Sequence, residues 1–231
     1  MLHEGLGSTA MWKEFPELLA QSTGLPVLLY DRYGYGLSQA LNGPFRDDFI
    51  EHEGEIVFEE VIRLLGIQNP LIVFGHSDGG SVALVAASVC KKIIAVVVEA
   101  PHVFIEQHSL KGLLAAQDAW QNPKFRQNLT KYHGHQAEAL FKAWIGKWLQ
   151  PASTHWDIYS YLPGIQAPLL FIQGYDDQFG TAAQWDETSK RVQGSAEFLY
   201  LENCGHIPHL QAQQIVIEAV SNFISQVQKT L

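Results

Sequence analysis

Short apolar runs alternate with longer amphipathic segments along this chain of 231 residues. The runs are rich in β-branched side chains and are bounded by glycine, proline or polar residues, a pattern typical of buried strands. Strands that alternate with helices predict a mostly parallel central sheet with helices on both faces. We predict strands at residues 26–30, 70–74, 93–98, 169–173 and 197–201.

The amphipathic segments predict helices at residues 47–65 and 79–90 and at the carboxyl end of the chain. Gly66 suits the cap after the first of these, since glycine readily adopts the left-handed conformation found at helix ends. The first helix would present an apolar face made of Val57, Val61, Leu64 and Leu65. The last helix would present one made of Ile215, Ala219, Val220 and Phe223.

The strand rhythm breaks between residues 103 and 161, where the pattern is helical and polar. This stretch contains Trp120, Trp144, Trp148 and Trp156. Two interpretations fit: an inserted lid over a site, or packing helices whose tryptophans face the core. We predict an α/β core of residues 1–102 and 162–231 with a helical lid at 103–161. In this lid Trp144 and Trp148 would contact an apolar or aromatic part of a substrate.

Composition limits the class of protein. With 47% apolar and 17% charged residues the chain is globular rather than disordered. Its net charge of −9 argues against nucleic acid or an anionic membrane surface as a partner. No apolar run is long enough to cross a bilayer, and the start of the chain lacks the pattern of a signal peptide. Two cysteines make no disulfide framework, so we expect a cytoplasmic location.

The motif Gly-His-Ser-Asp-Gly at residues 75–79 lies between a predicted strand and a predicted helix. It fits G-x-S-x-G, the nucleophile elbow, a sharp strand-to-helix turn that exposes a serine. Glycines flank the serine because the turn is tight and its neighbours pack closely. Ser77 is therefore the candidate nucleophile. Because a serine hydroxyl is a weak nucleophile at neutral pH, it needs a positioned base.

Candidate partners for Ser77 follow two later strands. His206 comes after the last predicted strand, where it could reach back over the carboxyl ends of the sheet. Asp176 and Asp177 follow the strand at 169–173, and either could orient the imidazole. A turn or a helix cap is the alternative role for such an aspartate pair.

An oxyanion hole needs two backbone N–H groups aimed at the developing charge. The N–H of Asp78, directly after the serine, is one candidate. The second would come from the loop at residues 3–8, whose glycines let backbone approach a substrate.

Together these motifs resemble the α/β-hydrolase superfamily over essentially the whole chain, and Ser-Asp-Gly-Gly resembles its valacyclovir-hydrolase-like esterase branch. The resemblance implies that Asp177, three residues after a glycine, is the acid. It also implies that Gly5 and Leu6 are candidates for the second oxyanion donor. That branch acts on α-amino esters, so Asp78 would either pair with a substrate ammonium or contribute only its N–H. The loop at residues 31–38 resembles a structural loop of the family.

The expected activity is that of a serine hydrolase that cleaves a small carboxylic ester through an acyl-enzyme, with no cofactor. A carbon–carbon bond hydrolase of ring-cleavage products uses the same triad and stays open. So does a non-catalytic binding protein on the same fold. A metal enzyme is disfavoured because the histidines match no zinc motif. The sequence leaves the oligomeric state unknown.

The chain departs from the family at its start. In the family three strands precede the oxyanion loop, whereas here Met1 and Leu2 stand at the end of the third. If the third strand were absent from the middle of the sheet, the two strands beside it would have unpaired backbone N–H and C=O groups, which are costly when buried. We therefore expect a trimmed version of a longer protein, for which an inactive fragment is a further alternative.

Overall fold

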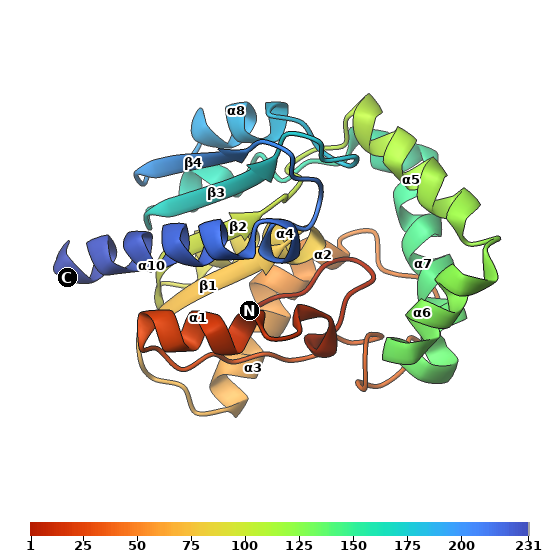
Figure 1. The fold of residues 1–231 in the computed structure, drawn as a ribbon, viewed down its shortest axis with the longest axis horizontal. Helices are drawn as coiled ribbons and strands as arrows, with labels where there is room; N and C mark the ends of the chain where they lie inside the picture. Colours follow the sequence, from red (N-terminus) through yellow and green to blue (C-terminus); the bar gives the residue numbers. More distant parts are fainter. Residues whose placement is uncertain (231) are drawn as a thin grey trace.

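The computed structural model describes residues 1–230, with Thr230 described by its backbone alone. Its strands form one parallel sheet in the order β1-β2-β3-β4 (Figure 1). This arrangement confirms the predicted parallel sheet and its strands from residue 70 onward. The strands are β1 (Leu71–His76), β2 (Ile93–Glu99), β3 (Leu169–Gly174) and β4 (Ala196–Leu201).

The strand predicted at residues 26–30 is wrong, because that segment pairs with no strand within residues 1–230. Beside β1 on this side lies Leu2, whose N–H donates to the Phe74 carbonyl at 2.8 Å and whose carbonyl accepts from the His76 N–H at 3.0 Å. A strand needs a hydrogen-bonded neighbour along its length, and one bridging residue does not supply it. The apolar run is therefore left without a ladder.

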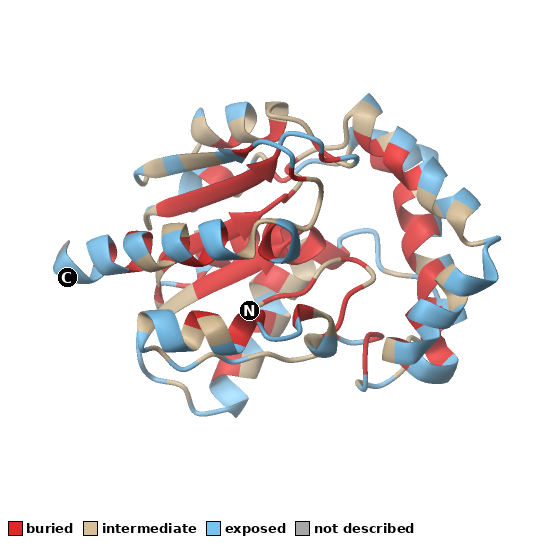
Figure 2. Cartoon of the chain, viewed as in Figure 1, coloured by how far each residue is buried: buried red, intermediate tan, exposed pale blue. Residues whose placement is uncertain are grey.

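Each face of the sheet has its own apolar core, because successive strand side chains point to opposite faces. Val96 and Phe171 pack on the face covered by α4. Val97 and Ile172 pack on the face covered by α10. Figure 2 shows that β2 and β3 are largely buried, that the edge strand β4 is partly exposed, and that the outward sides of the surrounding helices are exposed. The helices around the sheet are α1 (Phe15–Thr23), α2 (Phe49–His52), α3 (Phe58–Leu64), α4 (Asp78–Val89), α8 (Ala183–Ser189), α9 (Pro208–Gln211) and α10 (Gln213–Thr230).

The helix predicted at 47–65 forms as a continuous run of α2, a π-helical turn η2 (Glu53–Val57) and α3, and Gly66 follows it with a φ of 66°. Its predicted apolar face is wrong, since Leu64 and Leu65 are exposed. A π-turn adds a residue to one turn and rotates the face that follows. The side chains that this run buries are Phe49, Ile50, Phe58 and Ile62.

The apolar face predicted for the last helix is correct at Val220 and Phe223, which are buried, and wrong at Ile215, which is exposed. Val216 and Ile217 are buried instead. Neither this helix nor any other in residues 1–230 has the length and apolar character needed to cross a bilayer.

Three helices, α5 (Gln107–Ala119), α6 (Pro123–His133) and α7 (Ala137–Leu149), stand apart from the sheet and appear in green on the right of Figure 1. They are the predicted insertion between β2 and β3. Trp144 and Trp148 of α7 are buried and belong to the apolar core around α4, and both also line a cavity. Trp144 and Trp148 therefore face the core and the cavity at the same time. Short 3-10 turns complete the chain: η1 (Thr9–Trp12), η3 (Gly134–Gln136), η4 (Pro151–His155) and η5 (Leu162–Gly164).

Candidate active site

The motif at residues 75–79 forms the turn between β1 and α4. Ser77 has φ 53° and ψ −122°, a region that is strained for a residue with a side chain. A Cβ on Gly75 would run into the backbone of Gly79, and one on Gly79 would run into the backbone of Leu2. The Ser77 N–H donates to the carbonyl of Glu99 at 2.9 Å, which fixes the turn to β2. The sharp turn therefore depends on both glycines.

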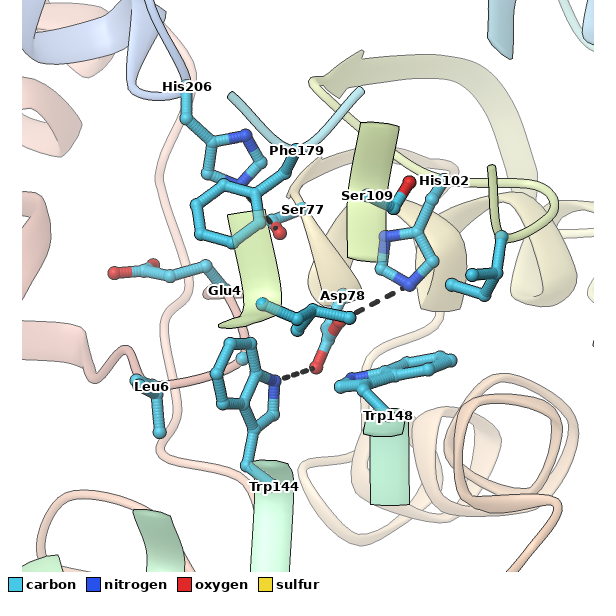
Figure 3. Close-up of a pocket in the computed structure, with 13 residues that line it drawn as sticks. Glu4, Leu6, Ser77, Asp78, His102, Ser109, Trp144, Trp148, Phe179 and His206 are labelled. Atoms are coloured by element: carbon cyan, nitrogen blue, oxygen red, sulfur yellow. Dashed lines mark hydrogen bonds and ion pairs between the residues drawn. The ribbon is translucent and has the colours of Figure 1, made fainter. Parts of the chain in front are cut away.

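His206 bridges Ser77 and Asp177. Its Nε2 lies 2.9 Å from the Ser77 Oγ, and its Nδ1 lies 2.9 Å from each carboxylate oxygen of Asp177. Figure 3 shows His206 directed at Ser77. Asp177 follows β3 and His206 follows β4, so the three side chains meet at the carboxyl edge of the sheet. This arrangement can pass a proton from the hydroxyl to the imidazole.

The structure brings Asp177, and not Asp176, to the imidazole. Asp177 is buried, whereas Asp176 is exposed. The Asp177 Oδ2 accepts from the Gln173 Nε2 at 2.6 Å, and the Asp177 Oδ1 accepts from the Phe179 N–H at 2.7 Å. Burial by itself would raise the pKa of Asp177, but the neighbouring His206 and the backbone donors hold that pKa below its ordinary value. The carboxylate is therefore charged and fixed in orientation.

Backbone donors surround the serine. Asp78 is the first residue of α4, where N–H groups have no acceptor within the helix. The N–H groups of Gly5 and Leu6 donate no backbone hydrogen bond within residues 1–230, and both residues line the cavity next to Ser77. A Cβ on Gly5 would run into the Trp144 indole and the Asp78 carboxylate. Glycine is thus required for the loop to lie this close.

Buried polar side chains hold that loop in place. Arg32 Nη2 donates to the carbonyls of His3 and Glu4 at 3.0 Å each. His3 accepts from the Arg32 N–H at Nε2 and donates to the Glu4 carbonyl from Nδ1. Burial, followed by the nearby Arg32 charge, lowers the pKa of His3 to about 3. No sequence motif predicted these contacts, although Arg32 lies in the loop at residues 31–38, which resembles a structural loop of the family.

A cavity of about 130 Å³ opens beside Ser77 and His206, and its lining is mostly apolar. Trp144 and Trp148 line one side of it, and His102 packs against Trp148 with ring centroids 4.8 Å apart (Figure 3). Other apolar lining side chains are Leu6, Ile105, Leu113 and Phe179. A cavity of this size and character fits a small apolar group.

The Asp78 carboxylate lies buried at the edge of this cavity with partners of its own. Trp144 Nε1 donates to Oδ2 at 3.2 Å, and the His102 Nε2 lies 3.4 Å from Oδ1 (Figure 3). Burial lowers the pKa of His102, so its ring is neutral at pH 7. The carboxylate is therefore already engaged by α7 before any substrate binds. No sequence motif pointed to His102.

No group of three or more histidine, cysteine, aspartate or glutamate side chains in the described part of the chain could hold a metal ion. Cys90 and Cys204 are both buried and free.

Comparison with known proteins places this geometry in a family. The profile of the Alpha/beta hydrolase family matches residues 1–219. A search of the curated proteins finds no match. The fold is similar to that of an enol-lactonase from Burkholderia xenovorans, with a TM-score of 0.73, 20% identity, and coverage of 97% of this chain and 89% of that one.

Two further solved structures share the fold. A thermophilic esterase from Thermogutta terrifontis has a TM-score of 0.71 and 17% identity, with coverage of 97% of this chain and 88% of that chain. A proline iminopeptidase from Mycobacterium smegmatis has a TM-score of 0.70 and 20% identity, with coverage of 99% and 89%. At these identities the likeness establishes the fold and leaves the reaction to the residues of the site.

Proposed function

This chain belongs to the α/β-hydrolase family, and we propose that it cleaves small carboxylic esters through an acyl-enzyme on Ser77. The observation that carries the proposal is the unbroken contact from the Ser77 Oγ through His206 to Asp177, 2.9 Å at each step. Proteins described as an esterase and an enol-lactonase share its fold, so an ester bond is within the range of this scaffold.

In the proposed reaction the Ser77 Oγ attacks the ester carbonyl while the His206 Nε2 takes its proton. The N–H of Asp78 and an N–H from Gly5 or Leu6 stabilise the oxyanion of the tetrahedral intermediate. The His206 imidazolium then gives the proton to the leaving alcohol, and Asp177 stabilises that charged ring. Water deacylates the serine by the same steps.

The cavity supports a small apolar acyl or alcohol group as the part of the substrate that is bound, with α5–α7 as the lid and Trp144 and Trp148 in contact with it. Because Trp144 Nε1 already donates to the Asp78 carboxylate, we propose that Asp78 meets the substrate through its N–H. An α-ammonium would have to compete with the Trp144 indole for that carboxylate. Matched esters with and without an α-amino group test this point, and a strong preference for the amino esters would contradict it.

Replacement of the nucleophile is the direct test. Ser77→Ala should lower kcat for a nitrophenyl ester by on the order of 10⁴ to 10⁶. A fluorophosphonate probe should label the wild-type protein at Ser77. Ser109→Ala serves as the control, since Ser109 also lines the cavity but lies outside the contact chain. Near-normal turnover by Ser77→Ala, or no labelling of folded wild-type protein, would refute the proposal.

A further inference from the structure

A second histidine lies directly behind the candidate nucleophile. His76 is the last residue of β1 and is fully buried. Its Nε2 lies 2.6 Å from the backbone carbonyl of His206, and its Nδ1 lies 3.5 Å from the Glu4 carboxylate. Glu4 lies in the loop at residues 3–8. One side chain therefore touches both the loop that carries the candidate base and the loop that carries the candidate oxyanion donors.

The two partners of His76 determine its protonation state. A carbonyl oxygen only accepts, so the Nε2 must carry a hydrogen. The Nδ1 lies 3.5 Å from the Glu4 carboxylate, an ion-pair distance at which a negative charge favours a hydrogen on Nδ1 over a lone pair. A neutral ring would present a lone pair to one of the two oxygens. The imidazolium is the state that fits this geometry.

The electrostatics of the pair agree with this assignment. Burial alone would lower the pKa of His76, but the Glu4 carboxylate, together with Glu99 and the His206 carbonyl, raises that pKa above its ordinary value. For Glu4, burial would raise the pKa, but contact with His76 brings it down to about 2. Each partner therefore favours the charged form of the other.

The other titratable groups around His76 are Glu99, His206 and His209. Glu99 of β2 acts on His76 at longer range, but its Oε2 is bound to the His209 Nδ1 at 2.7 Å. The rings of His206 and His209 lie 5.1 and 5.0 Å from the His76 ring, centroid to centroid. Since Glu99 has its own histidine, Glu4 is the carboxylate that contacts His76.

We propose that His76, as an imidazolium, is a positioning residue that ties the His206 loop to the oxyanion loop. The proposal rests on the proposed function. His76 does not line the cavity, so it acts through His206 and Glu4 rather than on the substrate. Loss of its proton would leave a lone pair facing the Glu4 carboxylate and release one of the two loops. We expect kcat to fall at alkaline pH while KM changes little.

Three variants test the tie. His76→Gln keeps an N–H donor for the His206 carbonyl but has no proton to lose, so kcat at pH 7 should fall by on the order of tenfold and the alkaline fall should disappear. Glu4→Gln removes the carboxylate, so the alkaline fall should move to lower pH. His135→Gln is the matched control, because His135 is exposed and should leave the profile unchanged. Alkaline profiles that coincide in wild type, His76→Gln and Glu4→Gln would overturn the proposal.

Nuclear magnetic resonance of the full chain gives a second readout that needs no substrate. At pH 7.5 both ring nitrogens of His76, assigned by their loss in His76→Gln, should be protonated. The downfield Nδ1 proton of His206 should shift in the same variant. A neutral His76 ring, or an unmoved His206 proton, would overturn the positioning role. Because the spectra are independent of turnover, absent esterase activity with the expected spectra would count against the proposed function alone.

Discussion

At the scale of single residues, two adjacent aspartates provide a matched pair. The Asp177 carboxylate contacts the Nδ1 of His206, while Asp176 is exposed. An asparagine at 177 would no longer favour the tautomer whose Nε2 accepts the serine proton. We expect Asp177→Asn to lower kcat for a nitrophenyl ester by on the order of 10⁴. Asp176→Asn should stay close to wild type, and equal losses in the two variants would contradict this assignment.

Motifs predicted Ser77, His206 and the pair Asp176 and Asp177, because each follows a strand and the carboxyl ends of parallel strands share one edge, but only the family resemblance chose Asp177 over Asp176. The groups around them were harder to foresee. His102 reaches the site only through the fold, and nothing local distinguishes it from a surface histidine. Gln173 carried a signal, since it is a polar residue at the end of an apolar run. The hydrogen bond from the Gln173 side chain to Asp177 explains why a polar residue stands in this buried strand.

At the scale of elements, the positions of the strands from β1 to β4 were predicted correctly. The buried face of the helical run α2-η2-α3 was predicted wrongly, because a local change in helix geometry rotates that face. The strands β1, β2 and β3 are mostly buried runs, and β4 is an edge strand with exposed residues, but the composition of each run indicated where it lies. The run α2-η2-α3 contains a π-turn at Gly54, where a Cβ would run into Val85 of α4. The close approach of Gly54 to α4 depends on the position of that neighbouring helix. A π-turn therefore cannot be predicted from a hydrophobic pattern that repeats every 3.6 residues.

The docking of α7 rests on a buried hydrogen bond that can be removed. Trp144→Phe keeps an aromatic ring but takes the indole N–H from the Asp78 carboxylate, a loss of about 1–3 kcal/mol. We expect faster amide hydrogen exchange in α7 with unchanged exchange in β2. Trp120→Phe is the control, since Trp120 stacks on Phe141 with ring centroids 4.2 Å apart and should keep that contact. If amide exchange in α7 is equally fast in Trp144→Phe and in wild type, the hydrogen bond from Trp144 to Asp78 does not hold α7 in place.

At the scale of the whole molecule, the parallel sheet and its two cores followed from the alternation of strands and helices. That alternation did not predict that residues 26–30 would lack a hydrogen-bonded partner strand, because strand pairing depends on which other segment lies beside them in the fold. The same side of the molecule holds His3, which is buried between Arg32 and the Glu4 carbonyl. With Nε2 accepting and Nδ1 donating, a further proton on His3 would face the Arg32 N–H.

This buried histidine should make the folded protein acid-sensitive. Its pKa is about 3 in the fold and 6.5 in the unfolded chain, so the unfolded state binds the extra proton between those values. Stability from His3 is therefore complete above pH 6.5 and is lost as the pH falls towards 3. Between pH 7 and 5 this loss is about 2 kcal/mol, at about 1.4 kcal/mol for each unit below 6.5. His102 and His133, whose pKa values are also lowered, act in the same direction, while Glu51 and Glu53, whose pKa values are raised, oppose it.

Denaturant unfolding of wild type and His3→Asn at pH 7 and pH 5 separates the contribution of His3 from those of the other groups. The free energy of unfolding of His3→Asn should fall by about 2 kcal/mol less than that of wild type, whereas equal falls would mean that His3 is protonated in the fold.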